Sequence, residues 1–120
     1  MSVATQEAVA EAITMERIVN EYSMTELSSQ FYAWGVDGPH AGPPWVRSRI
    51  VDPATGSGVG SGETGHLHVF DLANLDSVMA VQTQDIATRL ERGAFRLAGR
   101  DPSALPRGCS RAADELLRAR

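Results

Sequence analysis

Short segments of alternating apolar and polar residues, separated by glycine and proline, dominate the stretch from Trp45 to Ala98. Trp45–Val51 and Gly65–Leu72 each alternate in the period of two that is typical of a strand with one buried face. The turn Asp52–Gly56 and a glycine-rich stretch up to Gly62 separate them. Further strands are expected over Val78–Thr83, Ile86–Leu90 and Ala94–Ala98, with a hairpin turn at Glu91–Gly93. The pattern predicts a meandering antiparallel sheet or a small distorted barrel.

The N-terminal part of the chain has helical signals on either side of one short strand. A helix is expected over Ser2–Ile13, and Arg17–Glu21 is a candidate strand because it contains the apolar pair Ile18-Val19. Ser23-Met24-Thr25-Glu26 matches a capping box, in which a serine and a glutamate three residues apart cap a helix start. That signal predicts a second helix running through Tyr32.

The remaining segments complete an α+β prediction for a single domain over residues 1–120. Gly35–Pro44 holds three glycines and three prolines and is expected to be a loop. Asp101–Gly108 is a connector, and Ser110–Arg118 is a short final helix. The expected order is helix, strand, helix, then the small antiparallel sheet or barrel, then a C-terminal helix.

Composition excludes several classes of function. The net charge is −4, which argues against nucleic-acid binding because that depends on neutralising phosphates with basic residues. All eleven basic residues are arginine, so no lysine can act as a catalyst or phosphate clamp. Cys109 is the single cysteine, which rules out an internal disulfide and fits a reducing compartment. No apolar run approaches the roughly 18 residues of a membrane span, and a cytoplasmic location is expected.

Two distant groups of residues have the chemistry of a nucleotide site. Tyr22, Thr25 and Glu26 bring an aromatic ring, a hydroxyl and a carboxylate within five residues, and Asp85 and Arg100 follow at a distance. A ring can stack on a base, and the two oxygens of a carboxylate suit two ribose hydroxyls. A hydroxyl and an acid can meet phosphate and its metal.

These groups resemble motifs of adenylate-forming enzymes, the superfamily of acyl-CoA synthetases, peptide-synthetase adenylation domains and luciferases. The resemblance rests on Asn20-x-Tyr22-x-x-Thr25-Glu26 and on Thr83-Gln84-Asp85 with Gly99-Arg100. The stretches Phe70–Ser77 and Arg107–Ser110 are similar, more narrowly, to the acyl-protein synthetases, the long-chain-fatty-acid–protein ligases of bacterial luminescence. The similarity runs from about Glu16 to Leu117, and it corresponds only to the C-terminal third of such an enzyme.

The resemblance implies a role for each residue, and each also has a purely structural alternative. Tyr22 would stack on adenine, Thr25 would bind the α-phosphate, and Glu26 would help to hold Mg²⁺. Asp85 and Arg100 would bind the ribose of ATP or AMP. The alternatives are, in the same order, a half-buried aromatic, a first-turn threonine, a member of the capping box, a turn aspartate and a solvated arginine.

Three further positions qualify the resemblance. Asp101 lies where related enzymes hinge. Ser23 and Gln84 both occupy positions where the family usually has glycine, and the Ser23 side chain would hinder the close approach of a ligand.

Cys109 is the candidate catalytic residue. It precedes the expected C-terminal helix and is flanked by Arg107 and Arg111, and both features favour the nucleophilic thiolate. The resembled synthetases carry their acyl group on a cysteine in a similar Gly-Cys-Ser setting. The alternative is a small buried apolar side chain.

The function implied by the resemblance is ATP-dependent activation of a carboxylic acid, such as a long-chain fatty acid, followed by transfer to a cysteine as a thioester. An acyl-reductase would be the partner. The chain is expected to be inactive alone, because the phosphate loop and acid pocket of such enzymes lie upstream of the similar region. One alternative is a split enzyme completed by a separate N-terminal chain. Another is a non-enzymatic remnant or homodimeric module that uses an exposed patch of Phe31, Tyr32, Trp34 and Trp45.

Overall fold

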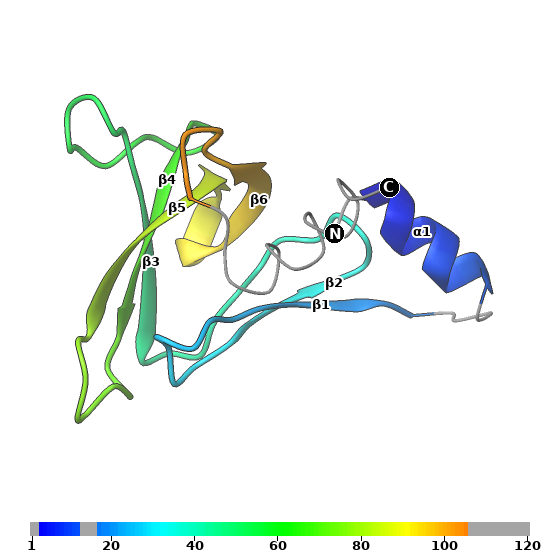
Figure 1. The fold of residues 1–120 in the computed structure, drawn as a ribbon, viewed down its shortest axis with the longest axis horizontal. Coiled ribbons are helices and arrows are strands. Elements are labelled where there is room, and N and C mark those ends of the chain that lie inside the picture. Colours follow the sequence, from blue (N-terminus) through cyan, green and yellow to red (C-terminus); the bar gives the residue numbers. More distant parts are fainter. Residues whose placement is uncertain (1–2, 13–16, 106–120) are drawn as a thin grey trace.

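The computed structural model describes residues 3–12 and 17–105, which form one helix and two antiparallel sheets (Figure 1). The elements are α1 (Val3–Ala12), β1 (Val19–Tyr22), β2 (Phe31–Trp34), β3 (Val46–Val51), β4 (Thr64–Asp71), β5 (Ala80–Arg89), the 3-10 helix η1 (Glu91–Gly93) and β6 (Phe95–Arg100). The predicted α+β class with a small, mostly antiparallel sheet or distorted barrel is confirmed. No helix in these two ranges is long and apolar enough to cross a membrane.

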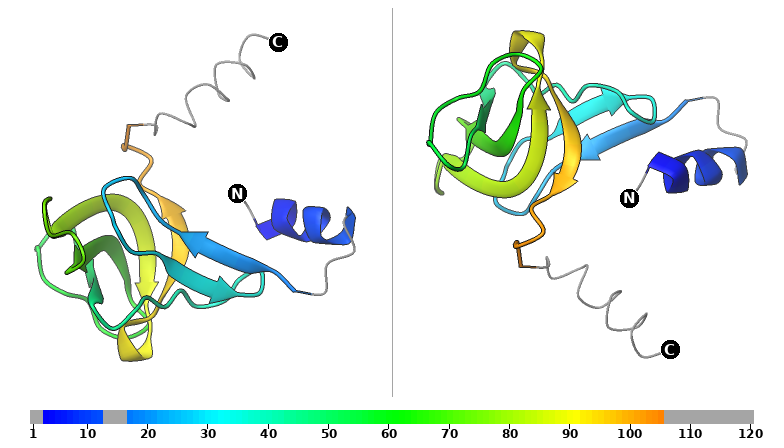
Figure 2. Two further views of the ribbon diagram at one scale, coloured as in Figure 1. Left: turned by 90° about the horizontal axis from the view of Figure 1, so that it is seen from below. Right: turned by 90° about the horizontal axis from the view of Figure 1, so that it is seen from above.

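The two sheets are joined into one curved structure by the segment between β2 and β3. β3–β4–β5–β6 is a four-stranded meander, and β1–β2 is a separate hairpin that extends toward α1 (Figures 1 and 2). Ala41 pairs with Tyr32 of β2, and both backbone hydrogen bonds measure 3.0 Å. His40 next to it pairs with Phe95 of β6, at 2.7 and 3.1 Å. Residues 40 and 41 therefore connect the hairpin to the edge of the larger sheet.

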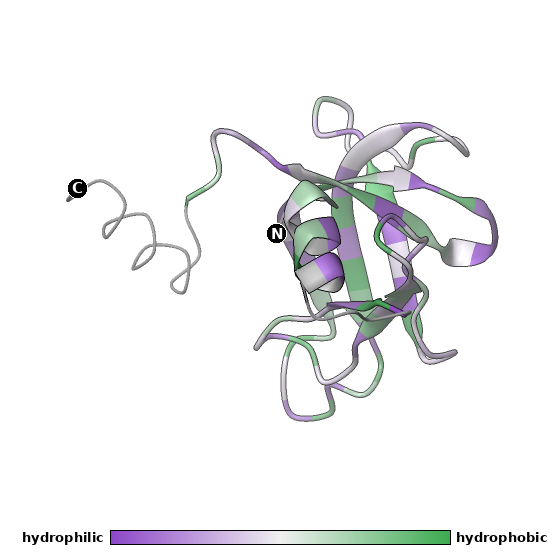
Figure 3. Cartoon of the chain, turned by 90° about the vertical axis from the view of Figure 1, so that its right-hand side faces the viewer, coloured by the Kyte–Doolittle hydropathy of each residue, from purple (hydrophilic) through white to green (hydrophobic). Residues whose placement is uncertain are grey.

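An aromatic cluster fills the space that these strands enclose. The Phe95 ring lies 5.1 Å from the Phe31 ring and 5.7 Å from the Tyr22 ring, both in edge-on geometry, and the His40 imidazole stacks on it at 5.4 Å. Burial lowers the pKa of His40. The side chains of Leu67 and Val69 of β4 are buried beside this cluster, and hydrophobic and hydrophilic residues are interspersed along the strands (Figure 3). Phe31 was expected in an exposed patch, and that prediction is wrong because its ring belongs to this core.

The predicted second helix, from Ser23 through Tyr32, is also wrong. The Ser23 hydroxyl donates to Glu21 at 2.8 Å, and the segment forms a tight turn in which the Leu27 amide donates to Met24. Phe31–Trp34 then continues as β2, with alternate side chains buried and exposed. Pairing with β1 buries the Phe31 ring, and this tertiary gain outweighs a local capping signal.

Gln84 and Asp85, which were predicted to separate two strands, instead lie inside the single strand β5. Together with Thr83 they face one residue, Leu67, on β4, so β5 bulges at this point. The Thr83 hydroxyl donates to the Leu67 carbonyl at 2.7 Å, and the Asp85 amide donates to that hydroxyl at 3.1 Å. The threonine side chain therefore satisfies backbone groups that the bulge leaves out of the ladder.

Candidate functional site

Tyr22 and Asp85, which are 63 residues apart in the sequence, are joined by a hydrogen bond. Tyr22 ends β1 and Asp85 is the last residue of the bulge in β5, and the tyrosine hydroxyl donates to Asp85 Oδ2 at 2.6 Å. Both residues are buried, with 6% and 7% of their surface exposed. The Tyr22 ring packs in the aromatic core, so its hydroxyl is the part that reaches the candidate site.

Arg100 lies directly opposite Asp85 in the ladder between β5 and β6. An extra residue, Ala98, bulges from β6 just before it, and Gly99 has a φ of +136°, a conformation that strongly favours glycine. The buried Nε of Arg100 has no hydrogen-bond partner among the described residues. Such a buried, unpaired donor is the kind of group that a ligand oxygen would satisfy.

Thr25 and Glu26 lie on the exposed turn three and four residues after Tyr22. The Thr25 hydroxyl makes a long 3.4 Å hydrogen bond to the Glu26 carboxylate. An exposed carboxylate beside a hydroxyl can provide one ligand to a Mg²⁺ ion that takes its other ligands from water and phosphate. In the described ranges, no three His, Cys, Asp or Glu side chains lie together in a group that could hold a metal ion.

The other predicted site residues lie at or beyond the C-terminal end of the described region. Cys109 and the expected helix Ser110–Arg118 lie outside the described residues. Asp101 follows β6, and its carboxylate lies 3.0 Å from His66 Nε2 on β4. Hydrogen bonds from the side chain and the amide of Ser103 lower the pKa of Asp101.

A second buried polar network holds the turn that carries Thr25 and Glu26, and sequence reasoning did not assign it a role. Asn74, in the loop after β4, accepts a hydrogen bond from the Ser28 amide at 2.9 Å and donates to the Glu26 carbonyl at 2.8 Å. Asp71 at the end of β4 is completely buried, and it accepts hydrogen bonds from both the amide and the hydroxyl of Ser29. The only sequence signal was that both residues lie in the stretch Phe70–Ser77, on which the family resemblance drew.

The sequence matches no known family model, and no curated protein is similar to it at a significant level. Solved structures, however, share its fold. MatB from Rhodopseudomonas palustris in the apo form is 20% identical with a TM-score of 0.60, and the match covers 88% of this chain and 25% of MatB. The McyG A-PCP structure complexed with phenylalanyl-adenylate is 20% identical with a TM-score of 0.61, covering 90% and 24% of the two chains.

A luciferase-like enzyme from the nonluminescent mealworm Zophobas morio is 17% identical with a TM-score of 0.56, covering 84% of this chain and 30% of the enzyme. MatB has also been solved with bound ATP. This chain spans less than a third of the length of each of these proteins. It therefore shares the fold of one part of these proteins.

Proposed function

We propose that this chain is the C-terminal portion of an ATP-dependent acyl-adenylate-forming ligase and forms one wall of its nucleotide site. The observation that carries the proposal is the meeting of Tyr22, Asp85 and Arg100, which come from three distant segments. Arg100 lies opposite Asp85 in the ladder, and its buried Nε has no hydrogen-bond partner among the described residues. This donor and the Asp85 carboxylate together suit a ribose, which has hydroxyl groups that both donate and accept. The fold that the chain shares with adenylate-forming enzymes also supports this proposal.

In this proposal each residue acts on a different part of the nucleotide. Asp85 and Arg100 bind the ribose, Thr25 binds the α-phosphate and Glu26 provides a ligand to Mg²⁺. Asp85 is buried and already accepts the Tyr22 hydroxyl at Oδ2, so we expect a ribose hydroxyl to compete with that hydroxyl for the carboxylate. Stacking on adenine would additionally require the Tyr22 ring to leave its contacts with Phe31 and Phe95 in the aromatic core.

The proposal also includes activation of a carboxylic acid and transfer of its acyl group to Cys109. The carboxylate of an acid, such as a long-chain fatty acid, would attack the α-phosphorus of bound ATP. Pyrophosphate would leave, and the product would be a reactive mixed anhydride of the acid and AMP. The Cys109 thiolate would then attack the acyl carbon, AMP would leave, and the product would be a thioester. The upstream part of such an enzyme, in the same or a separate chain, would complete the site, and an acyl-reductase would accept the acyl group.

Replacing Asp85 by asparagine is expected to weaken AMP binding at least about tenfold, because hydrogen bonds to a charged carboxylate are worth about 1.5–3 kcal/mol. The parent chain should bind AMP with a Kd on the order of 1 mM, measured by isothermal titration calorimetry. Asp76→Asn, an exposed aspartate in the loop between β4 and β5, is the matched control and should bind like the parent.

Tyr22→Phe tests the competition for Asp85, because it keeps the ring and removes only the competing hydroxyl. Its affinity for AMP should equal or exceed that of the parent. Equal binding by the parent and Asp85→Asn, with both folded by circular dichroism, would remove Asp85 from the nucleotide site.

The second candidate is a homodimeric interaction module, and the outward face of the β1–β2 hairpin favours it. Val19 and Trp34 are exposed and lie opposite each other in the ladder, and Tyr32 follows on the same face. If this face forms a dimer, light scattering should give twice the chain mass, and Trp34→Ala should return the protein to a monomer. A monomeric parent chain at high micromolar concentration would count against this candidate.

A further inference from the structure

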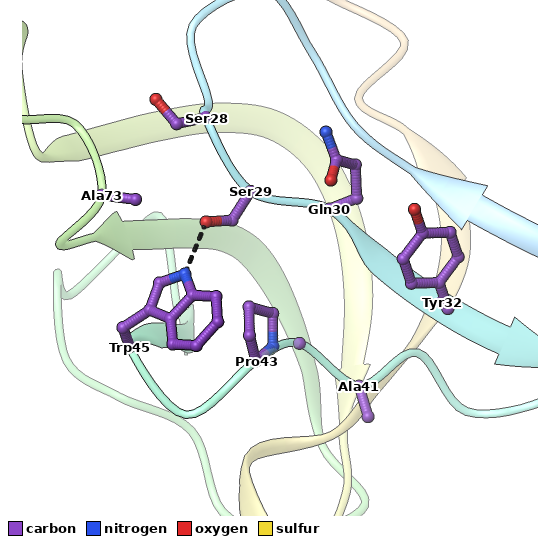
Figure 4. Close-up of a pocket in the computed structure, with 9 residues that line it drawn as sticks. Ser28, Ser29, Gln30, Tyr32, Ala41, Pro43, Trp45 and Ala73 are labelled. Carbon is purple, nitrogen blue, oxygen red and sulfur yellow. Dashed lines mark hydrogen bonds between the residues drawn. The ribbon is translucent and has the colours of Figure 1, made fainter.

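A pocket of about 510 Å³ lies beside β2 (Figure 4). Its walls come from the turn before β2, the segment before β3 and the loop after β4. They include Ser28, Gln30, Tyr32, Pro43, Trp45 and Ala73. Tyr22, Thr25, Glu26, Asp85 and Arg100 do not line it. Its volume is in the range of small-molecule sites, which are commonly about 300–1,000 Å³.

One wall of the pocket is an indole ring that is anchored by hydrogen bonds to buried polar groups. The Trp45 indole N–H donates to the Ser29 hydroxyl at 3.0 Å, and that hydroxyl donates to the Asp71 carboxylate at 2.9 Å. Ser29 and Asp71 are both buried, while half of the Trp45 surface is exposed. The indole therefore has a fixed orientation and an open face before any ligand arrives, which reduces the entropy lost on binding.

The opposite wall and the floor are also built into the fold. The backbone of Tyr32 is held by its two hydrogen bonds to Ala41, and 46% of the residue is exposed. Gly42 lies so close to the core that a Cβ there would be only 2.7 Å from Cε1 of Phe31. Any larger residue at this position would have to displace a core ring, so the shape of the floor depends on glycine.

The polar groups of the pocket are few and uncharged. The side chains of Ser28, Gln30 and Tyr32 make no hydrogen bonds within the described residues, so a hydroxyl, a carboxamide and a phenol are available to a ligand. No charged side chain lines the pocket. An ionic ligand would lose hydration here without gaining a counter-ion, which is unfavourable.

We propose that this pocket is a binding site for an uncharged ligand with a flat ring and a carbonyl or amide group. The ring would pack against Trp45, Pro43 and Tyr32, and the carbonyl or amide would hydrogen-bond with Gln30 or Ser28. The site is separate from the proposed nucleotide site and does not depend on it. A nucleotide, being anionic, should not occupy it.

Benzamide is a suitable probe because it combines a ring with an uncharged amide. Titrated into the ¹⁵N-labelled chain, it should cause saturable shifts of the Trp45 indole and Gln30 side-chain NMR signals, with a Kd on the order of 1 mM. Benzoate has nearly the same shape but carries a charge, so it should bind at least about tenfold more weakly. The absence of saturable shifts with benzamide, or equal binding of benzoate, would overturn the proposal.

Tyr32→Ala and Trp34→Ala form a matched pair, because both residues are exposed on the same face of β2 but only Tyr32 lines the pocket. Tyr32→Ala should weaken benzamide binding about tenfold, since it removes one aromatic wall. Trp34→Ala should leave it unchanged, and a well-dispersed spectrum shows that each variant is folded. Equal loss in both variants would indicate unspecific binding to exposed aromatics. Shifts of the same pocket signals by AMP would contradict the separation of the two sites.

Discussion

Replacing Phe95 by alanine is expected to lower the free energy of unfolding by about 4 kcal/mol, because a fully buried phenylalanine leaves a large cavity when it is truncated. Its ring contacts those of Tyr22, Phe31 and His40, so no neighbour can collapse into the space without leaving the others. A loss of this size is a large share of the 5–15 kcal/mol that is usual for small domains. Urea unfolding, followed by circular dichroism, measures it.

Two other variants provide reference values for the change in unfolding free energy. Phe95→Leu keeps most of the apolar volume and should cost about 1–2 kcal/mol. Trp34→Ala removes a larger side chain from an exposed position of β2, and it should change stability by less than about 0.5 kcal/mol. If Phe95→Ala cost no more than Trp34→Ala, the aromatic cluster would not be the core of the domain.

Replacing Asp71 by alanine is expected to lower the free energy of unfolding by about 3 kcal/mol. The carboxylate accepts hydrogen bonds from the Ser29 amide at 2.8 Å, the Ser29 hydroxyl at 2.9 Å and the Ala73 amide at 3.0 Å. Removing it leaves these donors unpaired in a buried place. Since Ser29 also holds the Trp45 indole, the change should weaken benzamide binding as well.

The contribution of Asp71 to the free energy of unfolding should decrease at low pH. Burial alone would raise the pKa of its carboxyl group, but the hydrogen bonds from Ala73 and Ser29 together outweigh burial and lower the pKa below the ordinary 3.8. The lower folded-state pKa means that this stabilisation is fully present above 3.8 and is lost as the pH falls through the folded-state value.

Asp71→Asn is the variant that tests this pH dependence, because it keeps the shape of the side chain and cannot ionise. The difference in unfolding free energy between the parent and Asp71→Asn should be constant between pH 5 and 7 and should shrink below about pH 4. A difference that grows on acidification would mean that the Asp71 pKa is raised in the folded state.

The strands of the sheet could be predicted because their signals are local. Trp45–Val51 and Gly65–Leu72 alternate clearly, and the observed β3 and β4 begin and end within one residue of these ranges. The helix predicted through Tyr32 failed because the capping box was the only local signal available there. Whether Phe31 is buried by a helix or by a strand depends on its partner in β1, which a local pattern does not contain.

The candidate site, like the fold, could be predicted only in part from the sequence. The residue types Tyr22, Asp85 and Arg100 indicated a nucleotide site from the sequence, but not that the Tyr22 hydroxyl would hold the Asp85 carboxylate in a buried position. The contacts among Asp71, Ser29 and Trp45 could not be predicted from the sequence, because the three residues belong to three segments with no shared motif.

The sequence by itself determined the antiparallel meander, the absence of lysine chemistry and the residue types of the candidate nucleotide site. These properties depend on composition and on neighbours along the chain. The tertiary structure alone decided that residues 23–30 form turns and bends instead of a helix, that Tyr22 contacts Asp85, and that an uncharged pocket forms between Tyr32 and Trp45. All three depend on contacts between residues far apart in the sequence, and such contacts exist only after the strands have paired.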